Sequence, residues 1–227
     1  MSGQERSGDM TKRLILGVFL AVVVGVGSFF VAYRLWPHGG QTEAQPDIIA
    51  ERDQLTREEA AKPRFEGVVN GIRLYPTSAG PAVQRKSACS DAKPEEVEEL
   101  TMSNVAGTPM EIIPTYLPPG AEEVDPMWPP VACKGIVANV QRDWIIRGKG
   151  HFYISRRQGE QAIDIDASAD RVSAATVGGR PAVVEAPLGP DGFGQSMVIV
   201  AEDFGITIVF ADGLPLEETV KIAEGLQ

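Results

Sequence analysis

The sequence predicts an α+β fold: a single amino-terminal transmembrane helix and a tether, followed by an antiparallel sheet with a carboxyl-terminal helix packed on it. Three observations support this prediction. Residues 14–36 form an apolar run with no charge before Arg34, which is long enough for the roughly 20 residues that cross a bilayer as a helix. Residues 109–213 contain many short strand-like segments separated by turn residues. Residues 214–226 have the periodicity of an amphipathic helix.

A cleaved signal peptide is the alternative interpretation of the apolar run. Signal peptides have a shorter apolar region, about 7–15 residues, followed by a cleavage site with small residues two positions apart. Here the bulky Phe30 stands two positions before Ala32, so we expect a retained membrane anchor. The residues expected at the two membrane interfaces are Lys12, Arg13, Tyr33, Arg34 and Trp36.

Basic residues near the ends of the apolar run predict the orientation, because Lys and Arg stay on the cytoplasmic side. Lys12 and Arg13 precede the run, whereas no Lys or Arg lies between Arg34 and Arg52. We therefore expect a single-pass protein of the cell membrane with a cytoplasmic amino terminus and an extracytoplasmic carboxyl-terminal domain. Residues 14–36 would make its contact with the lipid bilayer.

Small residues recur at every fourth position in the apolar run, at Gly17, Ala21 and Gly25. Such a row can let two membrane helices approach closely enough to form a homodimer. Gly and Ala are also common in membrane helices generally, and we favour this explanation over a dimer interface.

The sequence around the apolar run divides into a tail, a tether and a domain. Residues 1–13 are polar and too short to bury a core, which predicts a cytoplasmic tail. Residues 37–64 form the tether, in which residues 47–62 have helical character and are interpreted as a solvated linker helix. Residues 65–227 have the composition of one extracytoplasmic α+β domain, and residues 109–227 are its best-defined part.

The first part of the domain contains few apolar residues. Asn70-Gly71 separates two strand-like runs, residues 65–69 and 72–75, and predicts a two-residue hairpin. Pro94 stands at a suitable first position for a short helix over the acidic residues that follow it. We expect this first part to depend on the rest of the domain for its packing.

The second part of the domain is rich in strand signals. In residues 161–168, Ile163 and Ile165 alternate with acidic residues, as in a strand with one buried face. Gly178-Gly179-Arg180 predicts another hairpin. One face of the final helix is marked by four apolar residues, Leu216, Val220, Ala223 and Leu226. Further strands are expected at residues 135–147, 151–156, 171–177, 181–186, 196–201 and 206–210.

The chain contains two cysteines, Cys89 and Cys133. If the predicted orientation is right, both lie in an oxidising compartment, where an even number of cysteines usually indicates pairing. The alternative is two separate buried thiols, which pack as small apolar side chains. We favour a disulfide, because it would pin the weakly packed segment around Cys89 to the start of the main sheet.

Candidate catalytic and metal-binding residues do not match a known pattern. The two histidines, His38 and His151, belong to no recognisable zinc motif or Ser-His-Asp triad. Four residues resemble the start of a calcium loop: Asp164, Asp166, Ser168 and Asp170. However, Ala169 stands at the position that requires glycine, so we interpret these four residues as a solvated strand edge.

Two other groups invite a functional interpretation. The glycines of LGPDGFGQS, residues 188–196, are spaced like those of a phosphate-binding loop, but a strand follows where a helix amino terminus is needed. A glycine-rich turn is the simpler explanation. Four carboxylates could act as acid and base but are better explained as a solvated face: Glu95, Glu96, Glu98 and Glu99. We expect no catalytic residue, no metal and no cofactor.

The chain is acidic, with a net charge of −10 at pH 7. This charge argues against binding to nucleic acid or to anionic lipid headgroups. Two functions remain. The first is a membrane-anchored binding or sensing domain for a small ligand, a lipid or an envelope protein, and the second is a cell-envelope enzyme whose active site is not visible in the sequence. Because no reactive cluster is recognisable, we expect the first and no enzyme activity.

Four sequence blocks add a family resemblance: PTYLPPGAEEV at residues 114–124, GKGHFYISRRQ at 148–158, VGGRPAVVEAP at 177–187, and the final segment 197–226. Together they resemble a bacterial family of unknown function that forms the extracytoplasmic carboxyl-terminal half of single-pass, anti-sigma-factor-like membrane proteins. The resemblance begins near Met110 and is most specific in the LPPG turn, the GGRPA hairpin and the final helix. It implies a sheet-plus-helix fold and a tethered sensing or envelope role, without enzyme activity.

Overall fold

The computed structural model describes residues 46–77 and 89–226. The predicted transmembrane segment, its interface residues, the possible homodimer row and the cytoplasmic tail lie outside the described residues. Within the described ranges, no helix is long and apolar enough to span a membrane. All described residues belong to one compact unit, residues 42–227.

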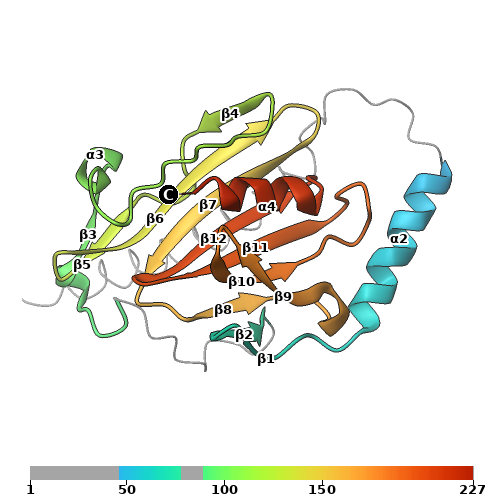
Figure 1. Ribbon diagram of the computed structural model, residues 1–227, viewed down its shortest axis with the longest axis horizontal. Coiled ribbons are helices and arrows are strands. Elements are labelled where there is room, and N and C mark those ends of the chain that lie inside the picture. The colour runs from blue at the N-terminus through green and yellow to red at the C-terminus, as the bar shows by residue number, and fades with distance from the viewer. Residues whose placement is uncertain (1–45, 78–88, 227) are drawn as a thin grey trace, which may run out of the picture. The chain divides into compact units, whose positions relative to one another are not determined.

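Most strands form one large antiparallel sheet (Figure 1). Its strands follow the order β3-β5-β6-β7-β12-β11-β10-β9, and β4 pairs separately with β6. The bounds are β3 Val97–Glu99, β4 Ala121–Val124, β5 Val131–Cys133, β6 Ile136–Ile146, β7 Gly150–Gln158, β9 Val172–Val177, β10 Arg180–Glu185, β11 Gln195–Glu202 and β12 Gly205–Asp212. The strand runs predicted for the main sheet are therefore confirmed, with small shifts at their ends.

A second, smaller sheet contains β1 (Gly67–Val69), β2 (Ile72–Pro76) and β8 (Ala162–Ile165). Asn70 and Gly71 turn between β1 and β2 with positive φ angles of 49° and 82°, which confirms the predicted hairpin. The pairing of β2 with β8 is parallel, which the long stretch of chain between the two strands allows.

The large sheet lies between two apolar layers. Side chains alternate between the two faces of a strand, so Val198 and Val200 pack in the cluster beneath α4 (Leu216–Glu224). Met197 and Ile199 point the other way and pack against the small sheet. Figure 1 shows α4 lying across the large sheet. The predicted α+β arrangement, an antiparallel sheet with the carboxyl-terminal helix packed on it, is confirmed.

The buried face of α4 is rotated slightly from the predicted one. Thr219, Ile222 and Ala223 are buried, whereas Leu216 and Val220 are only partly buried at the margin of the same cluster. The hydroxyl groups of Thr219 and Ser196 lie 2.9 Å apart and share a hydrogen bond. This bond lets a polar helix residue face the sheet without an unsatisfied group.

The helix predicted to start at Pro94 is wrong. Pro94 does begin a helical turn, but the turn is a single 3₁₀ element, η2 (Pro94–Glu96), and the chain continues as β3. Strand β3 pairs with β5 along the edge of the large sheet. Its residues have no continuous apolar face, so the backbone partner offered by β5 decides the conformation. A short helix, α3 (Met102–Val105), follows instead.

The helix predicted over residues 47–62 is confirmed as α2 (Pro46–Ala61), but its interpretation as a solvated linker is wrong at its carboxyl-terminal end. Glu59 is only 5 % exposed, and its carboxylate accepts hydrogen bonds from Ser168. A helix with so weak an apolar stripe is held on the domain by charged and polar contacts, which periodicity does not detect.

Arginines fix the proline-rich segment that follows α3. Nη1 of Arg142 donates to the carbonyl of Ile112 at 2.7 Å. Nη1 of Arg156 donates to the carbonyls of Pro109, at 3.0 Å, and Glu111. Prolines lack the N–H that a regular ladder needs, and the segment makes an isolated bridge between Pro114 and Leu226. The two arginine side chains bind three more of its carbonyls and hold it along the sheet.

A candidate ligand-binding pocket at the loop end of the sheet

Four turns meet at one end of the large sheet and line an open pocket of about 430 Å³. They are the LPPG turn before β4, the β6–β7 turn, the β10–β11 loop and the connection from β12 to α4. The apolar part of the lining consists of Pro118, Pro119, Ile146, Leu214 and Pro215. Three of these turns lie in the sequence blocks 114–124, 148–158 and 197–226, and the fourth is the glycine-rich segment 188–196; the block 177–187 supplies no lining residue.

Two glycines at these turns allow them to touch backbone to backbone. A Cβ on Gly213 would lie 2.4 Å from the carbonyl oxygen of Lys149. A Cβ on Gly192 would lie 2.4 Å from the carbonyl carbon of Leu214. Such contacts exclude any side chain at these positions, so the pocket walls are packed tightly against each other.

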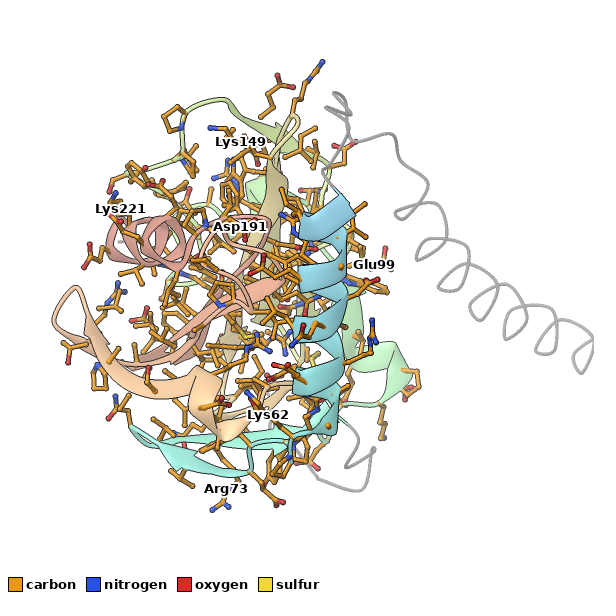
Figure 2. All side chains as sticks on the ribbon, turned by 90° about the vertical axis from the view of Figure 1, so that its right-hand side faces the viewer. Lys62, Arg73, Glu99, Lys149, Asp191 and Lys221 are labelled. Atoms are coloured by element: carbon orange, nitrogen blue, oxygen red, sulfur yellow. A yellow bond between two sulfur atoms is a disulfide. The ribbon has the colours of Figure 1, made fainter. Side chains whose placement is uncertain are left out.

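Three charged side chains complete the pocket: Lys149, Asp191 and Glu218. Figure 2 shows Lys149 and Asp191 in the same part of the domain as Lys221, away from Arg73. Glu218 accepts a hydrogen bond of 2.6 Å from the hydroxyl of Tyr116 and pairs with Lys221. The Tyr116 hydrogen bond, followed by the Lys221 contact, lowers the pKa of Glu218.

Asp191 is held by a residue of the tether helix. Its Oδ2 lies 2.6 Å from Nη2 of Arg52, and its Oδ1 accepts a hydrogen bond from the Phe193 amide at 3.0 Å. The Arg52 hydrogen bond lowers the pKa of Asp191. The guanidinium of Arg52 also lies 4.8 Å from the centre of the Phe193 ring, within the range of a cation–π contact. Helix α2 therefore reaches the pocket wall.

The other end of α2 is docked by a buried charge network. Arg171 lies between two carboxylates, with Nη1 at 3.0 Å from Glu59 and Nη2 at 2.7 Å from Glu185. Burial acts to raise the pKa of Glu59, but hydrogen bonds from Ser168 and Arg171 outweigh it and leave the pKa below its ordinary value. Burial raises the pKa of Glu185 to about 7, against the opposing effect of Arg171.

Of the residues that resembled a calcium loop, Asp166 and Asp170 are exposed, as expected of a solvated edge, but that interpretation is wrong for Ser168, which belongs to this docking site. Ser168 is buried against Glu59. Asp170 pairs with Lys62 at 2.6 Å, and Asp166 pairs with Arg64 at 3.0 Å. Among the described residues, no group of three or more acidic, histidine or cysteine residues could hold a metal ion.

The structure brings Cys89 and Cys133 together. Their sulfur atoms lie 1.92 Å apart and their Cα atoms 5.3 Å apart, in keeping with the predicted disulfide. The bond links the segment before η2 to the end of β5. The five predicted membrane-interface residues lie outside the described residues; they are Lys12, Arg13, Tyr33, Arg34 and Trp36. His38 lies outside them as well.

His151 lies on β7, directly opposite Asp212 of β12. Burial lowers the pKa of His151, although Asp212 and Asp143 act in the opposite direction. Its ring packs at 6.0 Å from that of Phe210. These contacts assign His151 a structural position on the sheet, outside the pocket lining.

The glycine-rich segment forms the expected turn, whereas the acidic cluster lies on η2 and β3 instead of a helix, and Glu96 is only partly exposed. The segment 188–196 is a turn between β10 and β11, and it supplies Asp191 to the pocket. Glu95, Glu98 and Glu99 are exposed.

Comparison with known protein families, curated proteins and solved structures found no match to this chain. The fold and the site together define a sheet-plus-helix domain with a pocket built from its turns.

Proposed function

We propose that this chain is a membrane-anchored extracytoplasmic binding or sensing domain, and that the pocket at the loop end of the sheet is its ligand-binding site. One observation carries the proposal. Arg52 of α2, the helix within the predicted tether, contacts Asp191 in the pocket wall at 2.6 Å. Occupancy of the pocket and the state of the tether helix can therefore affect each other.

The chemistry of the pocket favours binding over catalysis. Its two carboxylates, Asp191 and Glu218, have lowered pKa values, so both are ionised at neutral pH and can accept but not donate protons. The rest of the lining is largely proline and aliphatic, as in many ligand sites. Glu185 has a pKa suited to proton transfer, but its side chain is buried against Arg171 and does not line the pocket.

Labelling of a pocket residue tests location and binding together. Lys149→Cys would be introduced into the full-length chain, with Ser173→Cys, at an exposed position on β9, as the control. In spheroplasts, a membrane-impermeant maleimide should label both variants. Added muropeptides, short peptides or fatty acids, if bound in the pocket, should slow labelling at position 149 only.

Two outcomes would contradict the proposal. If neither position were labelled until the membrane was broken, the orientation would be wrong. If ligands bound to the full-length chain without slowing labelling at position 149, the pocket would not be the binding site.

A further inference from the structure

Asp191 and Phe193 together form a binding site for a planar cation, and the chain fills it with its own Arg52. The carboxylate of Asp191 lies 2.6 Å from Nη2 of Arg52, while the ring of Phe193 lies 4.8 Å from the guanidinium carbon. A carboxylate at the edge of a guanidinium and an aromatic ring against its face are the two contacts by which proteins select this group.

The loop that carries both residues has a defined conformation. The Phe193 amide donates to Oδ1 of Asp191 at 3.0 Å, so the carboxylate and the ring are fixed relative to each other. The backbone at Gly192 packs directly against Leu214. These contacts within the loop do not involve Arg52.

Arg52 itself is replaceable. The side chains of Arg52 and Asp191 are 45 % and 54 % exposed, and an ion pair with this exposure contributes weakly, by a factor of about five at most in its equilibrium. A soluble cation can therefore compete for Asp191. Asp191 also lines the pocket, beside Leu214 and Pro215, so a cation that carries an apolar group gains contacts that Arg52 does not make.

We propose that the pocket binds a ligand with a guanidinium or amidinium group on an apolar body, and that this group replaces Arg52 on Asp191. The proposal rests on the proposed function, since it names the ligand class of the same pocket. Replacement frees the amino-terminal turns of α2 from the domain. The last turn stays docked through Glu59, Ser168 and Arg171, so α2 pivots about that end.

The probes are benzamidine, which carries an amidinium on an aromatic ring, and benzamide, its neutral analogue of the same shape. Each is titrated into the full-length chain by ligand-observed NMR, and hydrogen exchange of α2 is followed by mass spectrometry. Benzamidine should bind and benzamide should not. Benzamidine should also speed amide exchange in the first half of α2 while leaving residues 57–61 unchanged.

Three variants test the exchange of cations. Arg52→Gln removes the internal competitor and should tighten benzamidine binding about two- to fivefold. Asp191→Asn keeps the acceptor for the Phe193 amide but loses the charge, and should weaken benzamidine binding about two- to fivefold. Arg57→Gln is the control, because Arg57 bonds within its own helix to the carbonyl of Asp53, and it should bind as the wild type does.

Equal affinity for benzamidine and benzamide would overturn this proposal, as would equal affinity of the wild type and Arg52→Gln. Failure of both probes to bind would also overturn it. The proposed function would survive these results if other ligands slowed labelling at position 149. The proposed function would fail, independently of the cation proposal, if ligands that bind to the chain left labelling at position 149 unchanged.

Discussion

Ser168 donates two hydrogen bonds to the carboxylate of Glu59, one from its amide at 2.9 Å and one from its hydroxyl at 2.8 Å, across a sequence separation of 109 residues. This contact joins the tether helix to the turn after β8. It places the end of α2 within the folded domain, because the carboxylate is buried there together with Arg171. Movements of α2 must therefore occur about this point.

Glu59→Ala should destabilise the domain by roughly 2–4 kcal/mol, because it leaves the Ser168 amide and one side of buried Arg171 without a partner. The free energy of unfolding would be measured by urea denaturation of a fragment containing residues 42–227. Glu58→Ala is the matched control, since Glu58 is exposed and accepts a hydrogen bond from Gln54 on the same helix. It should cost less than about 0.5 kcal/mol. Equal losses in the two variants would show that Glu59 does not dock α2.

Local patterns predicted the parts of this fold that local chemistry decides. The Asn70-Gly71 hairpin follows from turn residues that accept positive φ, and β8 follows from the alternation of Ile163 and Ile165 with acidic residues. The Cys89–Cys133 pairing followed from the cysteine count and the predicted compartment. In each case the information lies within a short segment or in composition.

Contacts between distant segments could not be predicted in this way. Strand β3 forms because β5 offers its edge, and no property of residues 97–99 alone indicates this. The docking of α2 depends on Ser168, which was interpreted as part of a solvated edge, and on Arg171, which was expected only as the start of a strand. The pocket required four turns to be brought to one end of the sheet, and a single sequence supplies no distances between them.

Gly192→Ala should destabilise the domain far more than Gly71→Ala. The two glycines have nearly equal φ angles, +81° and +82°, so both substitutions carry the same backbone penalty of about 1–2 kcal/mol. A Cβ at position 71 meets nothing within 4 Å, whereas one at position 192 would lie 2.4 Å from the Leu214 carbonyl carbon. Overpacking should add about 1–3 kcal/mol at position 192, measured by urea denaturation. Equal losses would show that the walls of the pocket can separate without cost.

Glu185→Gln should remove a pH dependence of stability between about pH 4.5 and 7. Burial raises the pKa of Glu185 from 4.5 to about 7 in the folded state, so the folded protein binds this proton more tightly than the unfolded chain. Its contribution to stability is full below the unfolded pKa and is lost as the pH rises through about 7, which amounts to roughly 3 kcal/mol.

The measurement compares the free energy of unfolding of the wild type and Glu185→Gln at intervals from pH 4.5 to 7.5. The free energy of unfolding of the variant should increase relative to that of the wild type as the pH rises, because the amide that replaces the carboxyl group at position 185 does not titrate. His151 also titrates in this window, and its lowered pKa makes stability rise with pH, but it is present in both proteins and cancels in the difference. Glu98→Gln, at an exposed position on β3, is the control for the loss of a surface carboxylate. Parallel curves for the wild type and Glu185→Gln would show that Arg171 keeps Glu185 ionised in the folded domain throughout this range.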